Sequence, residues 1–153
     1  SIKYGIESSI MPARLQILSK NPLIIVDAAH NPAGMISLVT FIKNIPNRKF
    51  LLIGISKTKD QITMLNIITP LFENIITTQS NFKPTDSFLL AQIAKQFNQN
   101  VSAIPNPIKS IKYILSQCSP KDTIVITGSF YFLSEIIPFI ENVVNKTNNT
   151  YKI

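Results

Sequence analysis

The stretch Leu23-Ile-Ile-Val-Asp-Ala-Ala-His-Asn-Pro32 decides how this chain folds. Its first four residues are apolar and mostly β-branched, and Asp27 ends the run, a pattern that predicts a strand at Leu23–Asp27 buried on both faces of a sheet. Pro32 then supplies a φ angle suited to the first turn of a helix, which we expect over residues 33–43. Open α/β sheets bind ligands, anionic ones in particular, where a strand ends and the next helix begins. Asp27 and His30, the only histidine of the chain, therefore mark a candidate binding site.

Length, composition and cysteine content restrict the class of protein. The 153 residues are the size of one domain, and 45% hydrophobic with 15% charged residues is typical of a folded globular protein. No apolar run approaches the roughly 18 residues that a membrane span requires, and we expect neither a signal peptide nor a membrane partner. Cys118 is the single cysteine, so a disulfide framework or a cysteine metal site within the chain is excluded. We expect a cytoplasmic protein.

A net charge of +7 is compatible with nucleic acid binding. The fifteen Lys and Arg residues are scattered singly and in pairs, however, and no ladder of aromatic residues like that of an RNA-binding sheet accompanies them. A lysine-rich solvated surface explains the charge, and we expect no nucleic acid partner. The basic field favours an anionic ligand such as a nucleotide.

Strand and helix patterns alternate along the chain. We expect strands at residues 13–19, 23–27, 49–55, 74–78, 101–104 and 123–127, and helices at residues 33–43, 61–72, 87–98, 108–117 and 130–145. The turn Lys20-Asn-Pro22 returns the first strand antiparallel to the second. This alternation predicts the α/β class: a Rossmann-like three-layer sandwich with an about six-stranded, mostly parallel sheet and one antiparallel strand at its N-terminal edge.

The motifs of a self-sufficient enzyme are missing from the sequence. It has no Gly-rich dinucleotide fingerprint, no phosphate loop and no nucleophile elbow. One histidine, one cysteine and eight scattered acids provide no ligand spacing for a metal, so we expect no metal site in this chain.

Three segments carry a family resemblance: Pro12-Ala-Arg-Leu-Gln-Ile-Leu18, Asp27-Ala-Ala-His-Asn-Pro32 and Thr127-Gly-Ser-Phe-Tyr-Phe132. In this order they resemble the C-terminal domain of folylpolyglutamate synthase/dihydrofolate synthase, a member of the Mur ligase superfamily of ATP-dependent amide-bond-forming enzymes. The segment Gly54-Ile-Ser-Lys-Thr-Lys-Asp60 also resembles the Gly-x5-Asp segment of that family. The resemblance runs from about Gly5 to about Phe139 and covers nearly the whole chain.

The resemblance implies an ATP site made of four residues. Asp27 would accept hydrogen bonds from the ribose hydroxyls, as suits an ionised carboxylate. Arg14 would contact the phosphates with a permanently charged, forked donor. His30 and Asn31 would line the phosphate side of the cleft, and His30 is the one possible catalytic group.

The resemblance also implies a site for L-glutamate. Ser129 and Tyr131 would hold the incoming glutamate, with His30 on the same side of the cleft. In the family reaction an acyl phosphate forms on the carboxylate of folate or dihydropteroate, and the amine of glutamate attacks it. The phosphate loop and the Mg²⁺ ligands of the family belong to a central domain that this sequence does not resemble.

The domain organisation follows from the resemblance. We expect an interdomain linker or arm at residues 1–12, a Mur ligase-type C-terminal domain at residues 13–145 and a flexible tail at residues 146–153. This domain would close on ATP from the N-terminal ATPase domain of the same protein, as a monomer. The parent protein would be an ATP-dependent acid–amino-acid ligase, while activity of this chain alone is left open because it has no phosphate loop.

Simpler interpretations of the same residues stay open. Asp27 could be only a helix N-cap, Arg14 could pair with a surface acid, and Ser129 could act as a cap as well as a ligand contact. Two departures from the family pattern are Ala13 and Ala28, where glycine is usual. The alternative functions are the C-terminal domain of a cell-wall Mur ligase and a stand-alone, non-catalytic module that binds a nucleotide or a partner.

Overall fold

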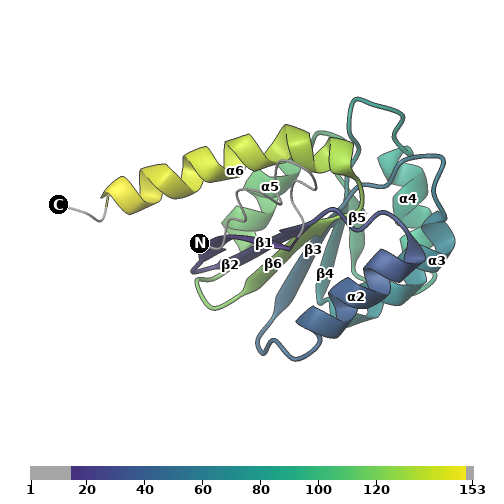
Figure 1. Ribbon diagram of the computed structural model, residues 1–153, viewed down its shortest axis with the longest axis horizontal. Helices are drawn as coiled ribbons and strands as arrows, with labels where there is room; N and C mark the ends of the chain where they lie inside the picture. The colour runs from purple at the N-terminus through teal and green to yellow at the C-terminus, as the bar shows by residue number, and fades with distance from the viewer. Residues whose placement is uncertain (1–14, 151–153) are drawn as a thin grey trace.

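A six-stranded sheet forms the middle of three layers (Figure 1). The computed structural model describes residues 15–150, with side chains as far as Thr147. The order of the strands is β1-β2-β6-β3-β4-β5, in which β1 pairs antiparallel with β2 and the other neighbours are parallel. The strands are β1 (Gln16–Lys20), β2 (Leu23–Asp27), β3 (Lys49–Ile53), β4 (Asn74–Thr77), β5 (Val101–Ala103) and β6 (Thr123–Thr127). The predicted α/β sandwich with one antiparallel edge strand is confirmed.

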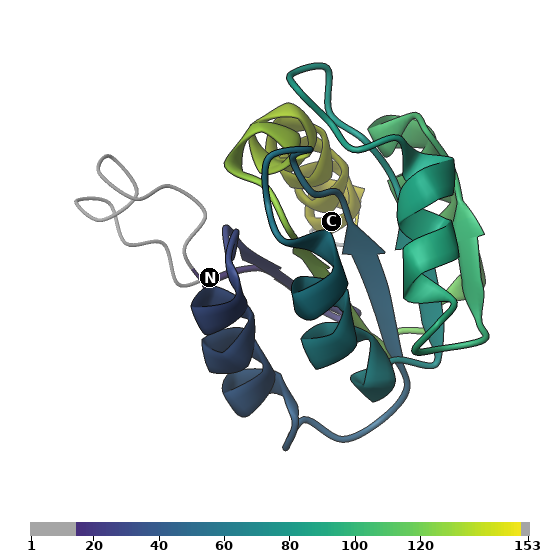
Figure 2. The same ribbon diagram turned by 90° about the vertical axis from the view of Figure 1, so that its right-hand side faces the viewer.

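Helices cover both faces of the sheet, as the view from the side also shows (Figure 2). On one face lie α2 (Pro32–Ile42), α3 (Gln61–Ile68), the short 3₁₀ helix η1 (Thr69–Leu71) and α4 (Ser87–Ala94); on the other lie α5 (Pro107–Gln117) and α6 (Phe130–Thr150). Strand side chains alternate between the two faces. Ile25 therefore packs with α2 to α4, and its neighbours Ile24 and Val26 pack with α5 and α6. All five residues of β6 are buried, as expected of a strand covered on both sides.

The helices α3 and α4 end earlier than the sequence predicted. The prediction extended them to residues 72 and 98, but their last residues are Ile68 and Ala94. Pro70 falls in η1, where a 3₁₀ turn accommodates a residue without an N–H. The side-chain amide of Asn98 donates to the carbonyls of Thr69 and Phe72, both at 2.9 Å, and so supplies partners that a longer α3 would have supplied.

The last helix, by contrast, is longer than predicted. Its end was expected near residue 145, followed by a flexible tail from residue 146, but α6 continues to Thr150. No glycine or proline interrupts residues 139–150, and the Thr147 hydroxyl donates to the Val143 carbonyl at 3.1 Å, so these polar residues continue the helix. Pro138 lies inside α6 at an exposed position, where water can reach the carbonyl that lacks its helical donor. Within residues 15–150, no helix has both the length and the apolarity needed to cross a membrane.

The strand order places the candidate site. Strand β6 lies between β2 and β3, and all three end at the same edge of the sheet. From that edge the chain leaves β2 toward one face, as α2, and leaves β6 toward the opposite face, as α6. Such a switch point opens a crevice between the two connections, and ligands of open α/β sheets bind there.

Candidate functional site

Asp27 lies at the switch point, at the end of β2 and opposite Thr127 of β6. The backbone carbonyl of Asp27 accepts a hydrogen bond of 2.6 Å from the Thr127 hydroxyl, which ties together two residues that are 100 positions apart in the sequence. Asp27 is half-buried, and strand alternation puts its side chain on the same face as Ile25, where α2 packs. The backbone of Asp27 is therefore held at a fixed point of the sheet edge.

His30 and Asn31 occupy the turn between β2 and α2. His30 is exposed, and its Nδ1 lies 3.0 Å from the Ala28 carbonyl. Because a carbonyl only accepts, Nδ1 is the donor in this contact, and in the neutral imidazole Nε2 is then the acceptor. Asn31 is the N-cap of α2, since its Oδ1 accepts from the Gly34 N–H at 2.8 Å. The simpler interpretation of Asp27 as that N-cap is therefore wrong.

Ser129 begins α6 and is almost completely buried, with 3% of its surface exposed. Its Oγ accepts from the backbone N–H groups of Tyr131 at 3.1 Å and Phe132 at 3.3 Å, so the predicted capping role is confirmed. The same oxygen lies 3.5 Å from the hydroxyl of Ser56, which comes from the loop after β3. Ser129 thus joins the two loops that flank the crevice.

Gly128, just before Ser129, has φ +119°, a conformation that side-chain-bearing residues rarely adopt. A Cβ at this position would collide with the Gly54 carbonyl oxygen and would lie 2.9 Å from the Ile53 side chain. The Gly54 N–H in turn donates to the Thr127 carbonyl at 3.3 Å. Glycine at position 128 is what lets β6 pass close to the end of β3.

Tyr131 does not point into the buried part of the site. It is 44% exposed, and its ring centroid lies 4.3 Å from that of Phe82 and 5.7 Å from that of Phe130. The predicted glutamate residues Ser129 and Tyr131 thus have different surroundings, one in the crevice wall and the other on the surface beside it.

The Gly-x5-Asp segment, residues 54–60, forms the loop between β3 and α3. Asp60 caps α3 through a bond of 3.2 Å from the Thr63 N–H. Sequence reasoning missed Gln61, whose side-chain amide donates to the carbonyls of Ser56 and Lys57 and to the Thr85 hydroxyl. Its position directly after the N-cap was only a weak sequence signal, because a residue at the start of a helix does not usually bond to neighbouring loops.

Arg14 lies outside the described residues, so its contact with the phosphates stays a prediction. The resemblance places it two residues before Gln16, the first residue of β1, which pairs with β2 in the sheet.

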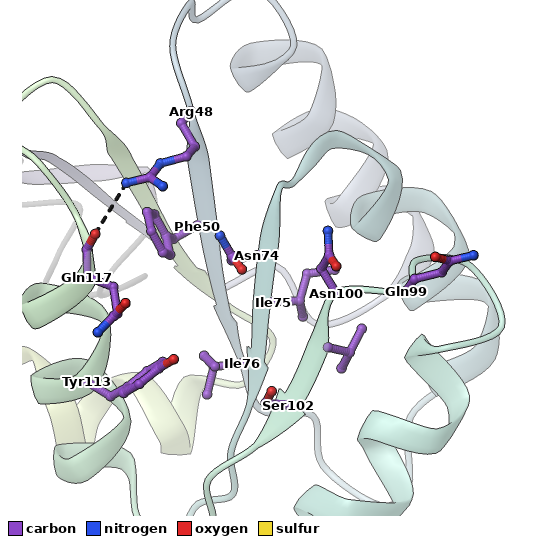
Figure 3. A pocket seen from close by; sticks show the side chains of 11 residues that line it. Arg48, Phe50, Asn74, Ile75, Ile76, Gln99, Asn100, Ser102, Tyr113 and Gln117 are labelled. Atoms are coloured by element: carbon purple, nitrogen blue, oxygen red, sulfur yellow. Dashed lines mark hydrogen bonds between the residues drawn. The ribbon is translucent and has the colours of Figure 1, made fainter.

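Two cavities lie away from the switch point. One, of about 310 Å³, is at the amino ends of the strands, where Arg48, Tyr113 and Gln117 surround it (Figure 3). The other, of about 550 Å³, lies between the loops after β4 and β5, against Glu135 of α6. Asp27, His30, Asn31 and Ser129 lie at the end of β2 and on the segments that follow β2 and β6, and none of them lines either cavity.

The fold and the loops at this edge define a Rossmann-like α/β domain of the ligand-binding class. Residues 13–130 match the family described as Mur ligase, glutamate ligase domain. The chain belongs to that family, and the resemblance noted from the motifs is confirmed.

The relatives are folate enzymes. The chain is 28% identical to the folylpolyglutamate synthase of Lacticaseibacillus casei, over 89% of this chain and 31% of that protein. It is 32% identical to the dihydrofolate synthase/folylpolyglutamate synthase of Buchnera aphidicola, over 89% of this chain and 33% of that protein. The chain thus spans about a third of the length of these relatives.

A solved structure has the same fold. Mycobacterium tuberculosis folylpolyglutamate synthase complexed with ADP superposes with a TM-score of 0.77 and 22% identity, over 84% of this chain and 32% of that one. At this identity the likeness establishes the fold alone.

Proposed function

We propose that this chain is the C-terminal domain of an ATP-dependent folate glutamate ligase, a folylpolyglutamate synthase/dihydrofolate synthase. The observation that supports it best is the meeting of Asp27, His30 and Ser129 at one switch point in a chain of the Mur ligase C-terminal family. In this proposal residues 13–145 are the closing domain and residues 1–12 the linker to an N-terminal ATPase domain. The helical residues 146–150 extend the last element of the domain.

In the proposed reaction Asp27 accepts hydrogen bonds from the ribose of ATP, and Arg14 contacts the phosphates. The start of α2 favours negative charge because its first N–H groups point out of the helix. His30 is exposed beside that helix end with Nε2 as an acceptor, so it can receive a hydrogen bond from a ligand in the cleft.

The second part of the reaction joins L-glutamate to the activated acid. The γ-phosphoryl group of ATP passes to the carboxylate of folate or dihydropteroate, which leaves ADP and an acyl phosphate. The glutamate amine attacks the acyl carbon, the bond from carbon to phosphate oxygen breaks, and inorganic phosphate leaves with formation of the amide. We assign Ser129 and Tyr131 to the glutamate side of this site, as the resemblance implies.

The resemblance places the Mg²⁺ ligands of the family in the central domain. Within residues 15–150, no three His, Cys, Asp or Glu residues lie together so that they could hold a metal ion. We therefore assign the metal to the N-terminal ATPase domain and derive no step from it in this domain. The proposal further takes the protein to be a monomer and places it in the cytoplasm, where its single cysteine suits a reducing compartment.

The test is a ligation assay on the full reading frame that contains this domain. We expect ATP- and glutamate-dependent ligation onto dihydropteroate or tetrahydrofolate. Arg14→Ala should lose at least about 100-fold, as expected for a charged group that contacts a transferring phosphoryl group. Asp27→Ala should raise KM for ATP, because it removes the charged acceptor of the ribose hydroxyls. Thermal unfolding should change little in Asp27→Asn, which keeps the shape of the side chain. Lys95→Ala, an exposed change at the far end of α4, is the matched control.

The outcomes separate the function from the site. No ligation by the unchanged protein would refute the proposed function and favour the stand-alone module. Ligation of an amino acid onto a cell-wall precursor would instead support the alternative function, that of a cell-wall Mur ligase. Normal ligation in both variants would keep the function and remove Asp27 and Arg14 from the site.

A further inference from the structure

Gln61 joins two loops at the carboxyl end of the sheet. It is the first residue of α3, and its side-chain amide donates to the carbonyl oxygens of Ser56 at 3.2 Å and Lys57 at 3.1 Å. The same nitrogen donates to the Thr85 hydroxyl at 2.9 Å. Ser56 and Lys57 lie on the loop after β3, whereas Thr85 lies on the loop after β4. These three bonds, here called the Gln61 contacts, use both N–H groups of the amide to hold one loop against the other.

The backbone also pairs these two loops, but at other atoms. Ser56 and Pro84 form an isolated antiparallel β-bridge, and the Thr85 N–H donates to the Ile55 carbonyl at 2.9 Å. This pairing sets the course of both loops without the side chain of Gln61. A variant that lacks this side chain should therefore keep the fold and lose only the fixed orientation of the peptide groups that follow Ser56.

The Gln61 contacts are partly shielded from water. Thr85 is 4% exposed, and the side chain of Gln61 is half-buried. Hydrogen bonds are stronger where water is excluded, and a buried polar group that loses its partner costs more free energy than an exposed one. Residues 57–59, by contrast, are exposed. Gln61 thus ties an exposed loop to a buried residue of the neighbouring loop.

The loop that Gln61 holds carries a hydroxyl group that faces the crevice wall. Ser56 Oγ lies 3.5 Å from Ser129 Oγ, and Gln61 bonds to the backbone carbonyl of Ser56 itself. Ser129 Oγ is fixed on its own side, because it accepts from the N–H groups of Tyr131 and Phe132 in the first turn of α6. The distance between the two hydroxyls is therefore set by the loop after β3, and through it by Gln61.

We propose that Gln61 is a positioning residue, whose amide fixes the loop after β3 so that the Ser56 hydroxyl faces Ser129. The inference rests on the proposed function, in which Ser129 lies on the glutamate side of the crevice. It adds Gln61 and Ser56, to which the sequence motifs gave no role. Gln61 contacts no substrate and acts through Ser56, whose hydroxyl completes the wall that receives L-glutamate.

The experiment is steady-state kinetics of the full-length protein, with ATP and glutamate varied in turn. Gln61→Ala should raise KM for glutamate about 3- to 10-fold, the effect expected when a few hydrogen bonds that order the wall are lost. KM for ATP and kcat should stay the same, because the wall binds glutamate equally in the ground state and the transition state. Gln61→Glu keeps the length of the side chain, but an ionised carboxylate cannot donate and would face two carbonyl oxygens. It should raise KM for glutamate more than Gln61→Ala does.

A double-mutant cycle tests whether Gln61 acts through Ser56. Ser56→Ala removes the hydroxyl that faces Ser129 and keeps the backbone carbonyl that accepts from Gln61. If Gln61 only positions this hydroxyl, the double variant should have the same KM for glutamate as Ser56→Ala alone. Independent effects of the two substitutions, which multiply in the double variant, would overturn the proposed action through Ser56.

Gln92→Ala is the matched control, since it makes the same chemical change at an exposed position of α4. Its kinetic constants and its thermal unfolding should equal those of the unchanged protein. In Gln61→Ala, an unchanged KM for glutamate would overturn the inference. So would an equal rise in KM for glutamate and ATP together with a lower unfolding temperature, because that result would make Gln61 a purely structural residue.

Two results distinguish this inference from the function on which it rests. Full ligation by the unchanged protein, with the same kinetic constants in Gln61→Ala, would overturn the positioning role and leave the ligase proposal in place. A protein without any ligation would remove both.

Discussion

Polar side chains at the two ends of the sheet have different hydrogen-bond partners. At the amino ends of the strands, Arg48 pairs with Asp122 at 2.7 Å and donates to the Gln117 carbonyl at 3.2 Å, and Asp122 accepts from the Ser119 N–H at 2.7 Å. At the carboxyl ends, Asn31 accepts from the first turn of α2, and Ser129 accepts from the first turn of α6 and lies 3.5 Å from the Ser56 hydroxyl. Arg48 and Asp122 therefore have a structural role, because they bond to each other and to nearby backbone groups. Asn31 and Ser129 hold the backbone in shape and leave the crevice to a ligand.

This difference explains why shifted pKa values do not mark the candidate site in this domain. The hydrogen bond from Arg48 lowers the pKa of Asp122, and burial raises the pKa of the Cys118 thiol beside them. Both groups lie at the amino ends, far from Asp27 and His30. Structural ion pairs shift pKa values as readily as active sites do, and here the shifted groups mark a structural pair.

The sharpest test of the comparison is Gly128→Ala at the carboxyl ends. The new Cβ would meet backbone, the Gly54 carbonyl, in a φ region that alanine avoids, so we expect a loss of about 3–5 kcal/mol in the free energy of unfolding. Urea denaturation measures it. Gly34→Ala is the control, since its Cβ would be 3.2–3.3 Å from Asn31 and Ala29 and its φ is ordinary. Equal losses in the two variants would contradict the special role of the turn at position 128.

A smaller effect is expected at the amino ends. Asp122→Ala removes the acceptor for both Arg48 and the Ser119 N–H, which should cost about 1–2 kcal/mol of stability. ADP binding by the full-length protein, measured by calorimetry, should stay unchanged because the pair lies at the end remote from Asp27. Weaker ADP binding would break the separation between the two ends.

The smallest effect is the pH dependence of that pair. The pKa of Asp122 is lowered by Arg48 from its ordinary 3.8, so its contribution to stability is complete above about pH 4 and is lost as the pH falls through the lowered value. Thermal unfolding between pH 5 and pH 2.5, in roughly that window, should therefore show a steeper decrease in the unchanged protein than in Asp122→Asn. Parallel curves would mean that the ion pair adds no stability in acid.

Local signals predicted most of the elements, and long-range contacts set the rest. The bounds of β2 follow from its own apolar residues and are confirmed. Alternation of strands and helices does not give the order of the strands, so the insertion of β6 between β2 and β3 could not be derived from it. The contact of Ser56 with Ser129 depends on that order. The cap of α2 was missed because Asp27 and Asn31 are both good capping residues and only the backbone geometry separates them.

The place of β6 has a consequence for how the domain is made. Within residues 15–150 this strand is the second to last element, yet it joins β2 to β3 in the middle of the sheet, across 100 residues in the case of Asp27 and Thr127. Pairing over such sequence distances is slow, and during synthesis it must wait until β6 has left the ribosome. Until then the inner edges of β2 and β3 have no partner and are open to wrong pairing. The late arrival of one strand thus completes the sheet and brings the two halves of the crevice together in a single step.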